Sequence, residues 1–340
     1  MDVSFQTREL PEALGNSEAF LDFQSKLSRV AAIDRPILII GERGTGKELA
    51  ANRLHFLSKR WDGPLVSLNC ASLGESVLES ELFGHEAGSF TGANKRREGR
   101  FEQAEGGTLF LDEIGLVSMS VQEKILRAVE YGMFERVGSS QSIVVDARII
   151  GATNANLVEL TRKEKFKSDL LDRLSFEVLH LPPLRYRSGD IAYLATRFAA
   201  SMSQELEFSS ASKFTASAMR SLESYEWPGN VRELKNVVER SVYRSGEGKV
   251  DEIDFAPFES PYKDPSSQPS ELVEPPQTDS QEEMESDASF QEQVRELEIR
   301  LLKRALEQCR RKQTDAAESL GLSYHQFRAL YRKYKQDLTV

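Results

Sequence analysis

The feature that most constrains the fold of this chain is a glycine-rich loop directly after a short apolar run. Residues 36–40 read PILII, and residues 41–48 read GERGTGKE. The spacing G-x-x-x-x-G-K is typical of a phosphate-binding loop, in which backbone N–H groups and a lysine, here Lys47, hold phosphate oxygens. Because such a loop joins a strand to a helix, the pattern predicts an α/β fold. A plain glycine turn is the alternative.

All eight residues of this loop are predicted to bind phosphate: Gly41, Glu42, Arg43, Gly44, Thr45, Gly46, Lys47 and Glu48. The last position usually carries serine or threonine, whose hydroxyl binds magnesium, and Glu48 offers no hydroxyl there.

Three further apolar runs extend the pattern. They occupy residues 66–69, 108–111 and 148–152, and helical patterns separate them. Short apolar strands that alternate with helices predict a parallel sheet covered on both faces. After Asp190 the pattern becomes helical and ends near Arg244, which predicts a small helical subdomain.

Two carboxylates end one of these strands, and the carboxyl ends of parallel strands are where such folds place their chemistry. We predict that Asp112 holds Mg²⁺ and that Glu113 polarises the attacking water. Solvated residues at a sheet edge are the alternative. The whole segment is assigned to the ATP site: Ala104, Glu105, Gly106, Gly107, Thr108, Leu109, Phe110, Leu111, Asp112 and Glu113.

Polar residues end two other strands. Thr153 and Asn154 are placed to sense the γ-phosphate. Asn69 could hydrogen-bond to Glu113 and hold it idle, although an asparagine that simply ends a turn is the alternative.

The composition changes after the helical subdomain. Residues 256–289 contain six prolines and nine acidic residues against one lysine. Such a segment buries too little apolar surface to offset its ordering entropy, so a flexible linker is predicted over a surface loop. Residues 303–335 then carry nine Lys or Arg and three Asp or Glu, which predicts an end that binds nucleic acid.

This basic end has the pattern of a helix-turn-helix. Residues 313–320 and 323–334 read as two helices joined at Gly321, with Ser323 as the cap of the second. A preceding helix is predicted from an apolar face of Val294, Leu297, Leu301, Ala305 and Leu306. The second helix would enter the major groove of double-stranded DNA with Tyr324, His325, Gln326 and Arg328 toward the bases, and Arg332 and Lys333 toward phosphate. A hairpin used only for dimerisation is the alternative.

Other features exclude several classes. Cys70 and Cys309 lack metal-ligand spacing, and the four histidines are scattered. The first residues lack the pattern of a signal peptide, and no run of about 18 apolar residues occurs. We therefore expect a cytoplasmic protein.

Six motifs occur in order: GERGTGKE, ELFGHEAGSFTGA, GGTLFLDE, LLDRL, LPPLR and WPGNVREL. In this combination the chain resembles the bacterial enhancer-binding proteins, AAA+ ATPases that activate the sigma-54 form of RNA polymerase. The likeness covers about residues 10–250 and again 291–340. It implies a five-stranded αβα sandwich with a helical lid, assembled as a ring, usually a homo-hexamer, with ATP at the subunit junctions.

The resemblance also assigns roles. Arg232 corresponds to the sensor II arginine of the lid, and Thr153 with Asn154 to sensor I. Glutamate at position 48 is the usual residue of the family. Arg173 is expected to act across the subunit interface. Lys167 departs from the family, which commonly has arginine there, because lysine gives no planar two-pronged contact.

A loop between the two nucleotide motifs is the family's contact to sigma-54. It normally reads GAFTGA and reads GSFTGA here. Its glycines permit large backbone changes, and its phenylalanine offers apolar surface to a partner. The contact residues implied are Gly88, Ser89, Phe90, Thr91, Gly92 and Ala93.

Trp61 lies in a polar turn and is assigned, weakly, to a partner contact, with a place in the core as the alternative. The chain resembles in particular the branch of the family that serves phage-shock operons. That branch lacks an N-terminal sensor domain and is restrained by an inhibitor protein, PspA. The resemblance thus implies regulation by an external protein.

The expected organisation is a tail (1–17), an α/β ATPase subdomain (18–185), a helical lid (186–250), an acidic linker (251–290) and a helix-turn-helix domain (291–340). The expected function is that of an activator that binds upstream DNA, hydrolyses ATP and converts sigma-54 polymerase from closed to open complexes. A helicase loader would share the nucleotide motifs but not the GSFTGA loop. A repressor with a vestigial ATPase is disfavoured by the intact Lys47, Asp112, Glu113 and Arg173.

Overall fold

The computed structural model describes residues 13–90, 93, 95–257, 290–309, 312–322 and 324–334. The chain forms two compact units, residues 1–259 and 260–340, and each is described by itself. Several expected features lie outside the described residues: positions 1–12, most of the predicted linker, and Thr91, Gly92 and Ser323.

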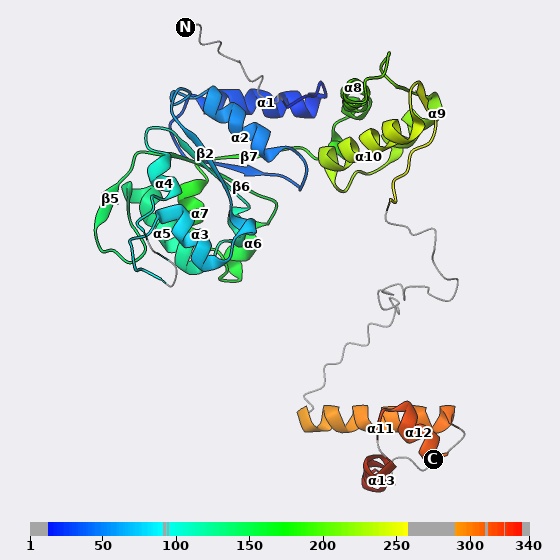
Figure 1. Ribbon diagram of the computed structural model, residues 1–340. Coiled ribbons are helices and arrows are strands. Elements are labelled where there is room, and N and C mark those ends of the chain that lie inside the picture. The colour runs from blue at the N-terminus through cyan, green and yellow to red at the C-terminus, as the bar shows by residue number, and fades with distance from the viewer. Residues whose placement is uncertain are drawn as a thin grey trace. The chain divides into compact units, whose positions relative to one another are not determined.

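The first unit is built on a five-stranded parallel sheet in the order β2-β3-β6-β1-β7 (Figure 1). The strands are β1 (Ile37–Ile40), β2 (Leu65–Asn69), β3 (Thr108–Asp112), β6 (Arg148–Thr153) and β7 (Glu177–His180). The four apolar runs of the sequence are all strands. The fifth strand, β7, went unpredicted because it is an edge strand with two exposed polar ends.

Helices cover both faces of this sheet. On one face lie α1 (Glu18–Ala31) and α2 (Lys47–Phe56); on the other lie α3 (Glu75–Phe83), α5 (Met119–Tyr131) and α7 (Ser168–Leu174) (Figure 1). Short elements join them: α4 (Arg100–Gln103), α6 (Leu157–Arg162), β4 (Met133–Glu135), β5 (Ser142–Val144) and the 3-10 turns Cys70–Ser72, Ile114–Leu116 and Leu184–Tyr186.

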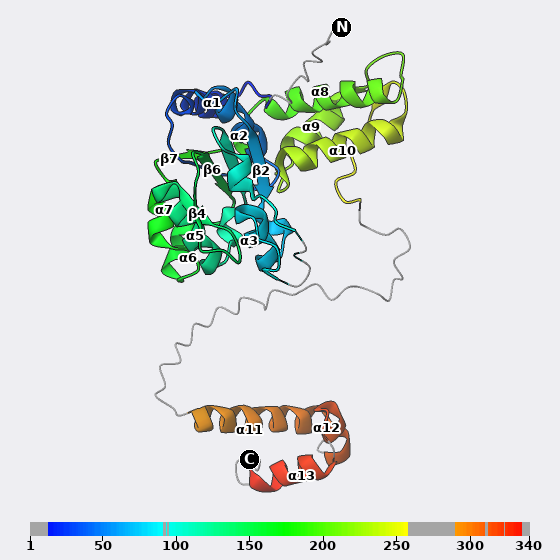
Figure 2. The ribbon, with the colours of Figure 1, turned by 60° about the vertical axis from the view of Figure 1, so that its left-hand side comes forward.

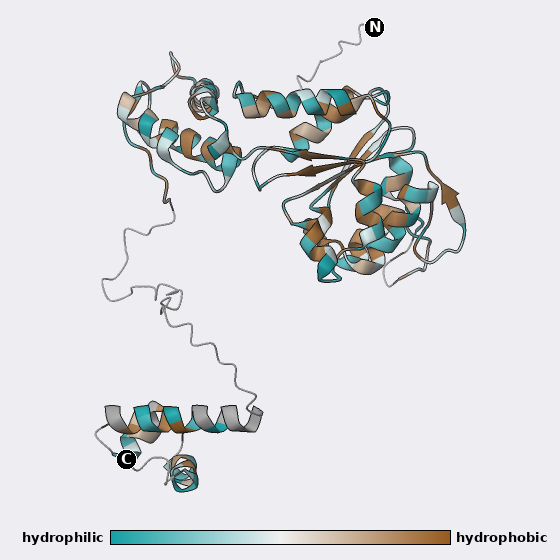
Figure 3. Cartoon of the chain, turned by 180° about the vertical axis from the view of Figure 1, so that it is seen from behind, coloured by the Kyte–Doolittle hydropathy of each residue, from teal (hydrophilic) through white to brown (hydrophobic). Residues whose placement is uncertain are grey.

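The alternation of strand side chains explains the two layers. In β1, Ile37 and Ile39 are buried against α1 and α2, and Leu38 is buried in the cluster on the other face. Figure 3 shows the strands as an apolar layer between amphipathic helices. Because each fully buried Leu or Ile contributes about 1.5–3 kcal/mol, burial on both faces stabilises the predicted αβα sandwich.

A helical lid follows the sandwich (Figure 2). It contains α8 (Asp190–Glu205), α9 (Ala216–Ser224) and α10 (Asn230–Ser245), and a short parallel pair, β8 (Lys213–Phe214) and β9 (Lys249–Val250). Its core includes the fully buried Trp227. Packing continues past the expected boundary at residue 250, because the ring of Phe255 stacks on Tyr225 with 4.4 Å between centroids.

The end of the expected N-terminal tail is not a tail. The Asp190 carboxylate accepts hydrogen bonds from the backbone N–H groups of Asn16 (2.6 Å) and Ser17 (2.9 Å). Arg187 pairs with Asp190 at 2.8 Å and donates to the Leu14 carbonyl at 2.7 Å. Residues 13–17 therefore form a strap, named so below, that ties the start of the sandwich to the lid.

The second unit contains α11 (Phe290–Gln308), α12 (Gln313–Ser319) and α13 (Tyr324–Lys333). Gly321 makes the expected turn with φ +66°. Leu302, Ala305, Ala317 and Phe327 are buried in its core.

One core prediction for α11 was wrong. Leu301 is 45% exposed and the next residue, Leu302, is buried. Of two adjacent leucines only one can face α12 and α13, and Leu302 shares the buried stripe with Ala305, three residues later. Among the helices that the structure describes, none is long and apolar enough to cross a bilayer.

The strap predicts a large effect of a single substitution. Asp190→Ala leaves the buried Arg187 without its partner and should lower the free energy of unfolding by about 3–5 kcal/mol. Chemical denaturation measures this, and hydrogen exchange at Asn16 and Ser17 should speed up. As a control, Glu159→Ala removes the exposed pair with Lys163 and should change little. Slow exchange retained at Ser17 in Asp190→Ala would contradict the role of the strap.

Candidate active site

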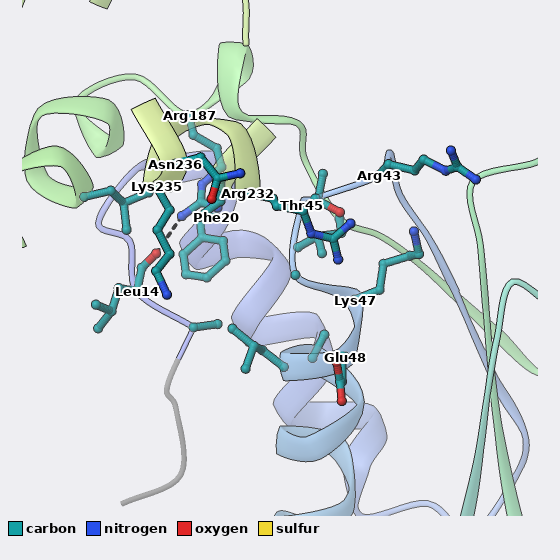
Figure 4. A pocket seen from close by; sticks show the side chains of 18 of the residues that line it. Leu14, Phe20, Arg43, Thr45, Lys47, Glu48, Arg187, Arg232, Lys235 and Asn236 are labelled. Carbon is teal, nitrogen blue, oxygen red and sulfur yellow. Dashed lines mark hydrogen bonds between the residues drawn. The ribbon is translucent and has the colours of Figure 1, made fainter. Parts of the chain in front are cut away.

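A cavity of about 1460 Å³ lies where the sandwich meets the lid. Figure 4 shows Thr45 and Lys47 of the phosphate loop on one side and Lys235 and Asn236 of α10 on the other. Its walls also include the strap residue Leu14 and the ring of Phe20. The predicted residues that line it are Arg43, Gly44, Thr45, Gly46, Lys47, Glu48, Asn69, Asp112, Glu113 and Arg232.

The glycines of the loop are required by its backbone. Gly44 has φ +77° and Gly46 has φ +103°, both in the region that favours glycine. A Cβ on Gly44 would lie 2.2 Å from the carbonyl oxygen of Gly229 in the lid. The loop therefore turns sharply into the N-terminus of α2 while the lid packs closely against it, and its backbone N–H groups gather at a helix N-terminus that favours an anion.

Lys47 is held inside the site. Its ammonium donates to the carbonyl of Gly41 at 3.0 Å and lies 3.6 Å from the Glu113 carboxylate. The side chain is only 7% exposed. A cation fixed at the mouth of the loop is placed to meet a phosphate, as the spacing of the motif predicts.

Two carboxylates face this lysine from the end of β3. The backbone of Glu113 has φ +55°, a left-handed conformation that is strained for a non-glycine residue and is common at functional sites. Asp112 accepts a hydrogen bond from the Glu113 N–H at 3.1 Å. Burial raises the pKa of Asp112, Lys47 opposes that rise, and the Glu113 charge adds to it.

The hydrogen bond predicted for Asn69 differs from the observed one. Its amide donates to Asp112 at 3.2 Å, not to Glu113, and its oxygen accepts from the Ala71 N–H at 2.9 Å. The physical reason is register: Asn69 and Asp112 are paired residues of the neighbouring strands β2 and β3. Asn69 thus contacts the acid expected to hold magnesium.

Much of the segment assigned to ATP lies elsewhere. Glu105 and Gly106 precede β3 and contact Asp146, at the opposite end of the strand from Asp112. The ATP-site assignment was wrong for the residues of the segment that do not line the cavity: Ala104, Glu105, Gly106, Gly107, Thr108, Leu109, Phe110 and Leu111. Most are buried core residues, because the motif is mainly the strand that carries the two acids.

Four predicted residues in or beside the loop, Gly41, Glu42, Thr153 and Asn154, do not line the cavity. Glu42 turns its side chain toward Arg185, with nitrogen–oxygen distances of 2.6 and 2.9 Å. Thr153 is fully buried, and its carbonyl accepts from the Gly41 N–H at 3.1 Å. Asn154 follows it and is exposed.

The pair expected to act between subunits lies on the surface. Arg173 in α7 is half exposed and pairs with Glu130 at 2.6 Å. Lys167, the residue directly before the same helix, lies 3.4 Å from Glu123. Neither lines the cavity, so within one chain the site contains no finger from α7.

Most of the other predicted contact residues that the structure describes are exposed, but Ala93 is buried, with its backbone hydrogen-bonded to Phe90 and Gly88, so its side chain is not available to a partner. Phe90 is 47% exposed, with its ring centroid 5.0 Å from that of His85. Trp61 is 62% exposed, which excludes the alternative of a core position. In α13 the side chains of Tyr324, His325, Gln326, Arg328, Arg332 and Lys333 are exposed.

Apart from Arg232, the sequence did not identify the residues on the lid side of the cavity. Lys235 and Asn236 lie three and four residues after Arg232 on α10, so they share its face. That helical spacing could have predicted both residues. No sequence pattern predicts Arg187 and Phe20, because tertiary packing brings the ring of Phe20 to 4.0 Å from the Arg187 guanidinium.

Two family descriptions match the chain: "Sigma-54 interaction domain" over residues 13–180 and "AAA+ ATPase lid domain" over residues 185–271. The Psp operon transcriptional activator of Escherichia coli K12 is 51% identical over 325 residues, which are 95% of this chain and 97% of that protein.

Longer relatives match in part. The nitrogen fixation protein VnfA of Azotobacter vinelandii is 47% identical over 70% of this chain, which spans 45% of its length. Among solved structures, NtrX from Brucella abortus in complex with ATP superposes with a TM-score of 0.66 at 31% identity, covering 98% of this chain and 70% of that one.

The edge of the site predicts a difference between the two cysteines. Cys70 is buried, and burial together with the charges of Asp112 and Glu113 raises its pKa to about 12. At pH 8 its thiol should therefore react very slowly. In a colorimetric thiol assay, folded Cys309→Ser should show no fast-reacting thiol, and one thiol should react after unfolding. In Cys70→Ser, the remaining thiol of Cys309 should already react in the folded protein. Fast labelling of native Cys309→Ser would contradict the burial.

Proposed function

The chain belongs to the family of sigma-54-dependent AAA+ transcriptional activators, and from this premise we propose that it binds and hydrolyses ATP in the cavity described above to remodel sigma-54 RNA polymerase from closed to open complexes. The observation that carries the proposal is the convergence of the phosphate loop, Lys47 and two strand-end carboxylates on one wall, opposite Arg232 of the lid. This arrangement suits a triphosphate, and a relative of the same fold was solved with ATP.

The position of each residue in the site assigns its role. Backbone N–H groups of the loop and Lys47 bind the β- and γ-phosphates. Glu113, held in its strained conformation, orients the attacking water and accepts its proton. Arg232 reaches the phosphates from the lid. Thr153 and Asn154 sense the γ-phosphate, and the Thr153 carbonyl is joined to the loop by the hydrogen bond from the Gly41 N–H.

The chain supplies only part of a magnesium site. Asp112 offers the oxygen ligands that Mg²⁺ prefers, beside the position where phosphate oxygens would lie. Bound there, it would neutralise charge on the phosphate oxygens. Among the described residues no group of three or more acidic, histidine or cysteine side chains could hold a metal, so phosphate and water oxygens would complete its shell.

We further propose a homo-hexameric ring in which Arg173 enters the site of a neighbouring subunit. Its exposure supports this role, since it lies outside the cavity of its own chain. Lys167, on the same surface, contributes charge without the two-pronged geometry of arginine.

The remaining contacts are proposed on the resemblance to the family and on the exposure and charge of the described residues. The GSFTGA loop touches sigma-54 through Phe90 and Thr91. The last helix reads upstream double-stranded DNA, and residues 291–340 form its helix-turn-helix domain. Trp61 meets the inhibitor PspA. The similarity to the Psp operon activator favours a phage-shock operon and a cytoplasmic location.

The hydrolytic step predicts a clean separation of binding from turnover. Glu113→Gln keeps the shape of the side chain but removes the base, so hydrolysis should fall at least about 100-fold while ATP still binds. Phosphate release and binding of a fluorescent ATP analogue measure the two. The matched control is Glu105→Gln, at the other end of the same motif, which should hydrolyse ATP normally. Normal turnover in Glu113→Gln would remove this residue from the mechanism.

The remodelling step is tested by capture of sigma-54. The purified chain, trapped with a transition-state analogue of ATP, should bind sigma-54, whereas Phe90→Ala and Thr91→Ala should not. Tyr243→Ala, which removes another exposed aromatic side chain, should bind as the parent does. If the parent hydrolyses ATP but never binds sigma-54, the loop serves another client, and a DNA-processing AAA+ machine becomes the better assignment.

A further inference from the structure

The outer side of the phosphate loop is tied to the lid by side chains that have no part in the chemistry above. Arg185 holds Glu42 with two hydrogen bonds, of 2.6 and 2.9 Å. The Glu42 carboxylate also accepts from the Asn230 amide at 3.0 Å. Neither Glu42 nor Asn230 lines the cavity. These three residues are called the loop–lid joint below.

Asn230 is the centre of the joint. It is fully buried, and its amide uses both kinds of hydrogen-bonding group. The NH₂ group donates to Glu42 and, at 3.1 Å, to the Arg43 carbonyl, and the oxygen accepts from the Leu184 N–H at 2.8 Å. One side chain thus joins the phosphate loop, the connector before the lid and the first residue of α10.

The backbone at this point is strained. Asn230 has φ +52° and Trp227 has φ +53°, both unusual for residues other than glycine. The Asn230 N–H donates to the Trp227 carbonyl at 2.8 Å, and the Trp227 ring is fully buried. Such a conformation persists only where surrounding contacts hold it, and the joint supplies those contacts.

The strained turn leads directly into the cavity. Two residues after Asn230, the N–H of Arg232 donates to the carbonyl of Gly44 at 3.2 Å. Arg232 and Lys47 therefore face the same space from two subdomains, and the joint sits behind both. An apolar contact would hold the subdomains together equally well but would not fix the direction of Arg232, since apolar packing is non-directional.

We propose that Asn230, with Glu42 and Arg185, is a positioning joint that sets Arg232 of the lid in register with Lys47 of the phosphate loop and carries nucleotide binding to the lid turn. The inference rests on the proposed ATPase function, because it assigns the joint to the same cavity. It concerns side chains that do not line the cavity.

The first test exchanges donor and acceptor in the full-length chain. Asn230→Asp sets a carboxylate against Glu42, and the KM for ATP should rise at least about tenfold. Adding Glu42→Gln restores a donor facing an acceptor at this contact, and part of that rise should be reversed, while the Arg43 carbonyl still faces the new carboxylate. Glu79→Gln, which breaks an ion pair with Lys124 on another face, is the control. If the double variant is no better than Asn230→Asp, the two side chains do not act together and the joint is overturned.

The second test is independent of hydrolysis. The chain has two tryptophans, so in a Trp61→Phe background Trp227 is the sole reporter at the lid turn. A non-hydrolysable ATP analogue should change its emission. Asn230→Gly, which keeps the backbone conformation but removes the side chain, should abolish that change while the analogue still binds.

These results separate the two hypotheses. The joint is overturned if the parent binds the analogue without a change in Trp227 emission. It is also overturned if Asn230→Gly shows the same change in emission as the parent. A parent that binds the analogue and shows the change but never hydrolyses ATP would leave the joint standing and remove the ATPase function instead.

Discussion

The close approach of Lys47 and Glu113 is the contact on which the site depends, because it joins two motifs that the chain keeps 66 positions apart. The charged atoms lie 3.6 Å apart and the side chains are almost fully buried. Charges can be buried in this way only when they are paired and hydrogen-bonded. The sheet makes the pairing possible: β1 and β3 are parallel and flank β6, so their carboxyl ends, with the loop and the two acids, open on the same edge.

What the sequence predicted well was whatever depends on spacing along the chain. The phosphate loop, four of the five strands and the acids Asp112 and Glu113 follow from local patterns, because a parallel sheet collects the ends of its strands at one edge. The segment before Asp112 was wrongly assigned to the ATP site as a whole, since its apolar residues form a buried strand and not a binding surface.

What the sequence did not predict depends on tertiary contacts. The partner of Asn69 is set by the register between β2 and β3, which no single motif encodes. The buried face of α11 contains Leu302 and not the predicted Leu301, because two adjacent leucines do not determine which one faces the core. The hydrogen bond from Asn16 to Asp190 spans 174 positions, and neither residue stands out in its own neighbourhood.

That strap gives the lid a second attachment. A lid joined only by the connector after β7 would be a body on a single flexible tether, free to swing in any direction. The lid is also held at Asp190, by the strap, and at Asn230, by the phosphate loop. Attachments at several places restrict the directions in which the lid can move. A small change at the phosphates can then produce a displacement of defined direction.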